Sequence, residues 1–165
     1  MKAASKIGFL PLFLVVLVFS SCLKKKEFPL EPQITFGSFV VHDDGLGADL
    51  TVNFTDGDGD IGLEDFDTVA PYNLGSEYYY NMYLDYYELI NGEWVLRELN
   101  PPFAYRVPSI TPSGQNKALE GEISVDLSPI YYDPTGADTI KFMVRIIDRA
   151  LNVSNEVESD IIITP

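Results

Sequence analysis

The sequence predicts an all-β protein folded as a single antiparallel β-sandwich of two sheets. Three observations lead to this prediction. From Ile34 onward apolar residues recur at every second position, β-branched and aromatic types dominate them, and no convincing stretch has the period of a helix. Such alternation buries one face of each strand and wets the other, as in an antiparallel sheet. The length of the chain suits one domain with one core.

We expect strands near residues 34–41, 49–55, 77–90, 93–99, 103–107, 120–128, 139–148 and 154–164. The third and fourth form a hairpin, because Asn91-Gly92 lies between them and this pair is favoured where a tight turn needs positive φ. Seven or eight strands of this kind predict a sandwich of the immunoglobulin or fibronectin type III kind. A closed barrel is the alternative.

The N-terminus has the layout of a secretory signal. Lys2 and Lys6 precede and flank the start of an apolar run from Ile7 to Phe19, and small residues follow it. The run is too short to span a bilayer as a mature helix. We therefore expect residues 1–21 to be a signal peptide that is removed.

The only cysteine of the chain, Cys22, follows the apolar run and Ser20-Ser21 directly. This arrangement resembles the lipobox of bacterial lipoproteins, and the resemblance implies cleavage before Cys22 and acylation of that residue. Several acyl chains would hold the domain permanently at a membrane. Leu23 after the cysteine favours the outer membrane, by resemblance to the enterobacterial sorting rule, and leaves open whether the domain faces periplasm or medium. The alternative is an ordinary secreted protein with an unpaired thiol.

The segment between the lipidated cysteine and the sandwich is predicted to be a flexible tether. Residues 22–33 contain Lys24-Lys25-Lys26, Pro29 and Pro32 and show no period. At about 3.3 to 3.6 Å per residue, the tether could hold the domain up to roughly 35 Å from the bilayer. The globular domain is then expected to span residues 34–165.

The charge of the chain excludes one class of partner. Removing residues 1–21 takes away two of the 11 basic residues and none of the 25 acidic ones, which leaves 9 − 25 = −16. Such an excess repels nucleic acid and anionic lipid from the globular part. We expect no nucleic-acid partner.

An acidic segment follows the second predicted strand. Six carboxylates occur within the twelve residues from Asp56 to Asp67, and such crowding is costly unless water, salt or a hard cation relieves it. Asp56, Asp58 and Asp60 match positions one, three and five of an EF-hand loop, but Ile61 stands where that loop requires Gly. The segment is therefore not an EF-hand.

Two interpretations of the acidic segment stay open. If residues 49–55 and 139–148 are strands B and F of the sandwich, the loops that follow them emerge at the same end. The carboxylates would then form a calcium site, and its predicted ligands are Asp56, Asp58, Asp60, Asp148 and Asn152, with Asn155 nearby. The alternative is a solvated turn in which Arg149 neutralises a neighbouring carboxylate.

The same two segments carry a second resemblance. A DGDGDIG turn after an early strand, together with a late strand that runs into DRALNVSN, is similar to uncharacterised Ig-like lipoproteins of Bacteroidota. The resemblance implies the sandwich fold and an outer-membrane location. It supplies no activity and no catalytic residue.

Tyrosines crowd the third predicted strand. Strict alternation places Tyr79, Tyr83 and Tyr87 on one face, together with Asn81 and Asp85. Flat rings beside hydrogen-bonding groups could stack on sugar rings or contact a protein. The alternative is cross-strand packing within the sheet.

Catalysis has little support in the sequence. His42 is the only histidine and lies at a strand end, so neither a histidine-based triad nor a zinc site is expected. We predict a non-catalytic, lipid-anchored envelope module that contacts or supports an envelope protein, with calcium as its one candidate cofactor. A glycan-binding module at the cell surface is the alternative function.

Overall fold

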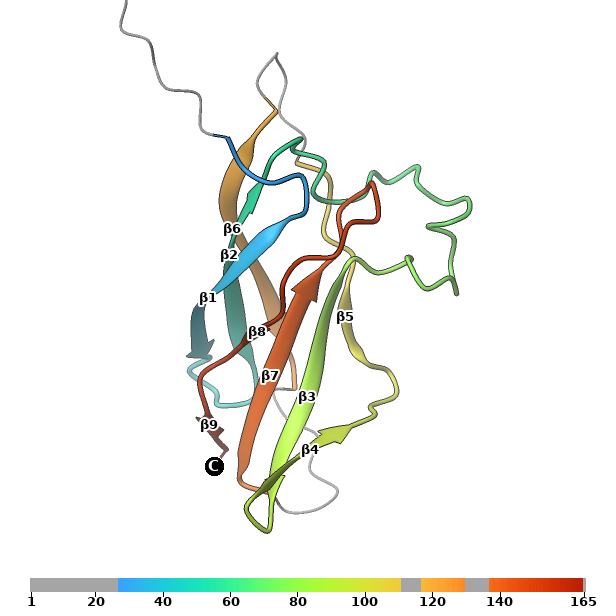
Figure 1. Cartoon of the computed structure of the whole chain (residues 1–165). Coiled ribbons are helices and arrows are strands. Elements are labelled where there is room, and N and C mark those ends of the chain that lie inside the picture. Colours follow the sequence, from blue (N-terminus) through green and yellow to red (C-terminus); the bar gives the residue numbers. More distant parts are fainter. Residues whose placement is uncertain (1–26, 111–116, 130–136, 165) are drawn as a thin grey trace, which may run out of the picture.

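A computed structural model of the protein describes residues 27–110, 117–129 and 137–164 (Figure 1). The described residues form two antiparallel sheets without a helix, which confirms the predicted all-β sandwich. The predicted signal peptide, Cys22 and the three lysines after it lie outside the described residues. Within the described part of the chain, no helix is long and apolar enough to cross a membrane.

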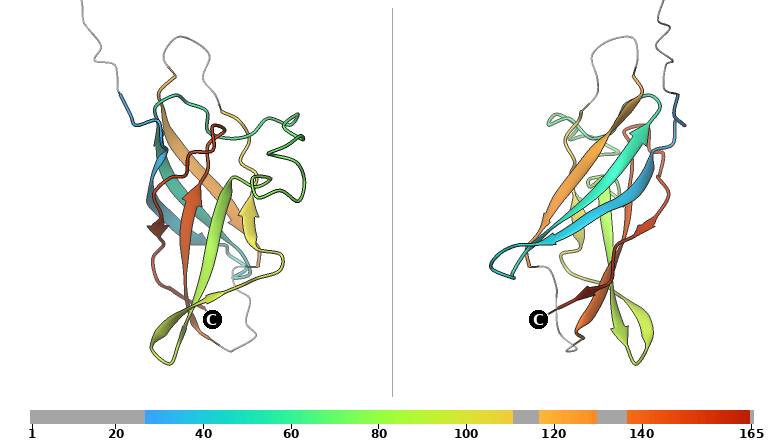
Figure 2. Two further views of the ribbon diagram at one scale, coloured as in Figure 1. Left: turned by 45° about the vertical axis from the view of Figure 1, so that its right-hand side comes forward. Right: turned by 90° about the vertical axis from the view of Figure 1, so that its left-hand side faces the viewer.

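The two sheets face each other as separate layers (Figure 2). The first sheet has the strand order β1-β2-β6, with β1 at Gln33–Val41, β2 at Ala48–Asp56 and β6 at Leu119–Leu127. The second has the order β4-β3-β7-β8, with β4 at Glu93–Arg97, β3 at Met82–Ile90, β7 at Thr139–Ile146 and β8 at Val157–Glu158. Two short strands complete it: β5 (Phe103–Tyr105) pairs with β3, and β9 (Ile162–Ile163) pairs with β7. The hairpin between β3 and β4 turns at Asn91-Gly92, where both residues have positive φ as predicted.

The third strand begins later than the alternation predicted. We expected it from residue 77, but β3 starts at Met82. The residue before it, Asn81, uses its side chain as a backbone mimic: its Oδ1 accepts from the amide of Val107 at 2.6 Å, and its Nδ2 donates to the Val107 carbonyl at 3.3 Å. Residues 76–79 form a turn instead of a strand, with the Tyr79 amide bonded to the Ser76 carbonyl. Tyr78, Tyr79 and Tyr80 therefore lie outside β3.

The last predicted strand, residues 154–164, forms only two short strands, β8 and β9, and a buried serine lies before the first of them and another between the two. Ser154 and Ser159 each accept a β7 amide with the side-chain oxygen, from Ile146 and Phe142 respectively, both at 3.0 Å. Each hydroxyl then donates to the carbonyl of the next residue. A hydroxyl thus replaces a backbone carbonyl in the ladder twice, and the regular strand is interrupted at both positions.

Asn155 joins the two sheets at their open edge. Its Oδ1 accepts from the Ile34 amide at 2.8 Å, and its Nδ2 donates to the Ile34 carbonyl at 2.9 Å. We expect Asn155→Ala to lower the free energy of unfolding by about 1 to 2 kcal/mol, because both backbone groups of Ile34 lose their partner. Urea denaturation measures this loss. Asn155→Asp keeps the acceptor and removes the donor, so it should cost less than the alanine; equal stability of all three proteins would contradict the assignment.

The core lies between the sheets and consists of the inward-facing residues of every long strand. Phe142 of β7 is completely buried at its centre, with its ring 5.6 Å from Tyr86, 5.6 Å from Phe103 and 6.1 Å from Phe39. All buried core residues fall between Ile34 and Ile162. The chain from residue 27 therefore contains every core residue that the structure describes.

Candidate metal centre

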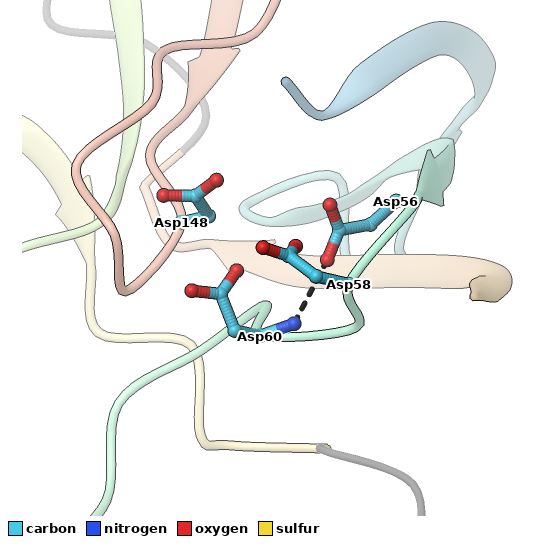
Figure 3. A group of neighbouring side chains, drawn as sticks. All are labelled: Asp56, Asp58, Asp60 and Asp148. Carbon is cyan, nitrogen blue, oxygen red and sulfur yellow. Dashed lines mark hydrogen bonds between the residues drawn. The ribbon is translucent and has the colours of Figure 1, made fainter. Parts of the chain in front are cut away.

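Two strands of opposite sheets deliver four carboxylates to one end of the sandwich. Asp56 is the last residue of β2, and Asp58 and Asp60 follow it in the loop toward β3. Asp148 follows the end of β7 by two residues. One oxygen from each of the four carboxylates lies within 4.8 Å of the others (Figure 3). The structure therefore brings together four of the five residues that the sequence predicted as ligands.

Backbone hydrogen bonds hold these carboxylates in place. The Asp60 amide donates to Asp56 Oδ2 at 2.9 Å, which closes the turn between them (Figure 3). The Arg149 amide donates to the Asp60 carbonyl at 3.1 Å, so the loop after β7 is bonded directly to the loop after β2. The site is thus built by two loops that support each other.

Three carboxylate oxygens in the cluster are buried without a partner. Among the residues that the structure describes, none donates a hydrogen bond to Oδ1 of Asp56, Asp58 or Asp60. Asp56 is completely buried. A buried polar atom without a partner carries a free-energy cost of about 1 to 3 kcal/mol, and more when it is charged. A cation bound among these carboxylates would supply the missing interaction.

Burial and the charges of neighbouring carboxylates raise the pKa of three members of the cluster, Asp56, Asp60 and Asp148. Loss of solvent is the main cause that raises the pKa of Asp56 to about 6, with the charges of Asp58 and Asp148 adding to it. The same causes, burial first, raise the pKa of Asp60 to about 6. Burial also raises the pKa of Asp148. Without a counter-ion, the ionised cluster is therefore a source of instability near neutral pH.

The fifth predicted ligand, Asn152, is hydrogen-bonded to a carboxylate of the cluster. Its amide donates to Asp148 Oδ1 and its Nδ2 to Asp148 Oδ2, both at 2.8 Å. Asn152 therefore orients the Asp148 carboxylate through its donors. The sequence also predicted that Asn155 lies near this cluster, but its side chain is hydrogen-bonded to the backbone of Ile34.

The position of Arg149 bears on the alternative interpretation, in which this residue neutralises a neighbouring carboxylate of a solvated turn. Arg149 pairs with Asp67, its Nη2 lying 2.8 Å from Asp67 Oδ1, and Asp67 is not a member of the four-carboxylate cluster. Asp67 itself is buried, and its other oxygen accepts from the Glu64 amide at 2.9 Å. Arg149 thus neutralises a neighbour as expected, but the neighbour is the last acid of the segment and not one of the clustered oxygens.

The part of the loop beyond Asp60 is fixed to the body of the domain. Leu63 is buried and bonds through both backbone groups to the segment before residue 110, pairing with Val107 and Ser109 at 3.0 Å each. Gly62 between the anchors has φ of 93°, and a side chain there would collide with the Pro108 carbonyl. This packing presets the loop before any ion binds.

Arg106 is a functional residue that the sequence analysis missed. Its guanidinium donates to three carbonyls of the loop between β2 and β3, those of Tyr79 (2.9 Å), Glu64 (3.1 Å) and Asp67 (2.8 Å). Nothing in the spacing of the sequence signals this role, because the three carbonyls come together only through the fold of the loop. Arg106 positions the loop that carries the cluster.

The predicted tyrosine stripe is divided by the late start of β3. Tyr83 and Tyr87 lie half-buried on the outer face of the sheet, whereas Tyr79 lies in the turn before it. A cation stands by each ring: Arg106 at 5.3 Å from the centroid of Tyr79, Arg145 at 5.0 Å from Tyr83 and Lys141 at 5.8 Å from Tyr87. The rings do not form one continuous row, and each already has a partner.

The histidine His42 is not a member of the carboxylate cluster. It sits after β1 with Nε2 3.4 Å from Asp49 Oδ1, and it packs beside Gly47. No described residue completes a triad with it in these contacts. Among the described residues, the one cluster of four carboxylates is the one that contains Asp56.

The fold and the site together define the class of this protein: an antiparallel β-sandwich that carries a four-carboxylate cluster on the loops at one end. No family model matches the chain, and no curated protein or solved structure matches it either. Its function therefore has to be inferred from the centre itself.

Proposed function

We propose that this protein is a non-catalytic, lipid-anchored module of the bacterial outer membrane, whose sandwich domain binds Ca²⁺ at Asp56, Asp58, Asp60 and Asp148 and supports or contacts an envelope protein. The proposed Ca²⁺ binding is supported by one observation: four carboxylates converge, and three of them have a buried oxygen without a hydrogen-bond partner. The lipid anchor rests on the signal-like N-terminus and Cys22. The absence of catalysis is an expectation from the sequence.

The chemistry of the centre suits calcium better than other common metals. All four donors are carboxylate oxygens, which are hard ligands, and the cluster contains neither His nor Cys of the kind that zinc prefers. Oxygens on opposite sides of a Ca²⁺ ion at about 2.3 to 2.6 Å lie about 4.6 to 5.2 Å apart. The donor atoms all lie within 4.8 Å of one another, close enough to share one Ca²⁺ ion, whereas Mg²⁺ usually keeps several waters and takes only one or two carboxylates.

Calcium would act on stability by cross-linking two loops. Asp56 ends a strand of one sheet and Asp148 follows a strand of the other, so an ion held by both would join the two layers at this end. Binding only to the folded state stabilises it by about 2.7 kcal/mol when free Ca²⁺ is one hundred times the dissociation constant. A rigid end is what a support or contact module needs.

Calorimetric titration of Ca²⁺ into the chain from residue 27, with thermal unfolding of the same samples, tests the proposal. We expect saturable binding to one site and a rise in melting temperature. The double variant Asp58→Asn, Asp60→Asn should bind no Ca²⁺ and, in EDTA, should melt above the unmodified protein, because it lacks two of the repelling charges.

A second double variant, Asp43→Asn, Asp160→Asn, serves as the matched control, since it removes two charges at exposed positions outside the cluster. It should bind Ca²⁺ as the unmodified protein does. No heat and no change in melting temperature at millimolar Ca²⁺ would reject the calcium centre. Equal loss of binding in both double variants would show a nonspecific effect of net charge and reject it as well.

A further inference from the structure

We infer that the end of the domain that carries the carboxylate centre rests on the lipid bilayer, with Phe66, Val69 and Leu74 as its apolar contacts. The inference rests on the proposed lipid anchor and calcium centre. It adds the part of the domain that touches the membrane, which neither of them specifies.

The first observation is an unusual set of exposed apolar side chains in the loop between β2 and β3. Leu74 is 78% exposed, Val69 72% and Phe66 71%. Outside this loop, only Ile163 exceeds 70% among the exposed large apolar residues of the described chain. Isolated exposed apolar residues are ordinary, but three so fully exposed within nine residues mark an interaction surface.

The second observation is that this loop is held in place while its apolar side chains point outward. Arg106 binds the carbonyls of Glu64 and Asp67 on either side of Phe66. The Tyr72 hydroxyl, between Val69 and Leu74, donates to the Arg149 carbonyl. The apolar side chains are therefore displayed by an ordered loop and do not result from a loose segment that has failed to find the core.

The third observation identifies the occupant. The described chain enters the domain at the same end as this loop (Figure 1), and the carbonyls of Phe28 and Pro29 pack so closely on Gly57 that a side chain at that glycine would collide with both. Because Phe28 and Pro29 are packed on the domain, only the first residues of the predicted 22–33 tether remain to span the distance to the lipid. Cys22 stands five residues before Glu27, a reach of at most about 18 Å. Lipid attached at Cys22 would therefore bring the bilayer to this end of the domain.

Charge determines the kind of contact. Apart from Lys24-Lys25-Lys26 beside Cys22, the chain is strongly acidic, so attraction to anionic headgroups does not hold the loop itself at the surface. Apolar side chains entering the boundary between headgroups and acyl chains supply the contact. A Ca²⁺ ion in the cluster would cancel two of its four negative charges and so favour a close approach.

Site-specific fluorescence on vesicles tests the inference. The chain from residue 22 is coupled through the Cys22 thiol to a maleimide lipid in phosphatidylcholine vesicles that contain doxyl-labelled acyl chains. Leu74→Trp in a Trp94→Phe background reports on the loop. The unmodified protein, whose one tryptophan lies on β4 at the opposite end of the domain (Figure 1), is the matched control.

We expect the tryptophan at position 74 to shift to the blue and to be quenched at least two-fold by the labelled lipid in Ca²⁺, and Trp94 to be unaffected. Adding Phe66→Ser and Val69→Ser should abolish the quenching.

Quenching that persists in EDTA would support the contact between the loop and the bilayer, and it would contradict the role of Ca²⁺ in that contact. A rise in melting temperature with Ca²⁺ but no quenching would overturn the surface and leave the calcium centre intact. A blue shift that grows with protein concentration without lipid would identify a second copy as the occupant and overturn the inference.

Discussion

In EDTA, lowering the pH from 7 to about 5 is expected to raise the stability of this protein by about 1 to 2 kcal/mol, the reverse of ordinary acid destabilisation. The pKa values of Asp56 and Asp60 are raised from 3.8 to about 6 in the folded state. Between these values the folded protein binds more protons than the unfolded chain, so the free energy of unfolding falls as pH rises through about 6. Protonation removes the buried charges that nothing compensates.

Saturating Ca²⁺ should reverse this dependence. The ion binds the ionised carboxylates, and protons compete with it below about pH 6. The difference in melting temperature between Ca²⁺ and EDTA should therefore be largest at pH 7 and nearly vanish at pH 5. Thermal unfolding on a grid of pH values, with and without Ca²⁺, measures it.

Asp56→Asn is the informative variant for this experiment. It removes the fully buried member of the cluster and should flatten the pH dependence in EDTA while abolishing the response to Ca²⁺. Asp43→Asn changes an exposed acid outside the cluster and should alter neither. Parallel pH profiles in EDTA and in Ca²⁺ would show that the cluster does not bind the ion.

Phe142→Ala is expected to cost about 3 to 5 kcal/mol of stability, the largest effect of a single substitution that we predict. The ring is completely buried and contacts aromatic side chains from both sheets, Phe39 on one side and Tyr86 and Phe103 on the other. The alanine leaves a cavity that the two layers cannot close without moving together. The free energy of unfolding of small domains is about 5 to 15 kcal/mol in total. If the value for this protein lies at about 5 kcal/mol, the variant should unfold near or below ambient temperature.

Urea denaturation at pH 7 with Ca²⁺ measures this loss. Phe142→Leu keeps most of the volume and should cost about half as much or less. Phe66→Ala is the matched control, because it removes an exposed phenylalanine and should change stability by less than about 0.5 kcal/mol. A similar loss in Phe142→Ala and Phe66→Ala would contradict the packing of the core.

The position of the strands was largely predictable because side chains alternate between the two faces of a strand with a period of two. Residues such as Leu50, Val52 and Phe54 of β2 and Ile140, Phe142 and Val144 of β7 are all buried as their alternation predicted. Errors arose where a side chain replaced a backbone group. Ser154 and Ser159 interrupt the last strand, and such replacements leave no periodic signal. The start of the third predicted strand is instead a turn, closed by the Tyr79 amide on the Ser76 carbonyl.

The candidate centre was predictable in composition but not in its electrostatics. The sequence by itself determined the alternation, and hence two sheets, and the topology of strands B and F placed Asp148 near Asp56, Asp58 and Asp60. Only the tertiary structure decided that their oxygens are buried, that Asn152 supports Asp148, and that Arg149 pairs with Asp67. The physical reason is that strand faces follow from local geometry, whereas burial and the pairing of charges depend on which loops meet across the two sheets.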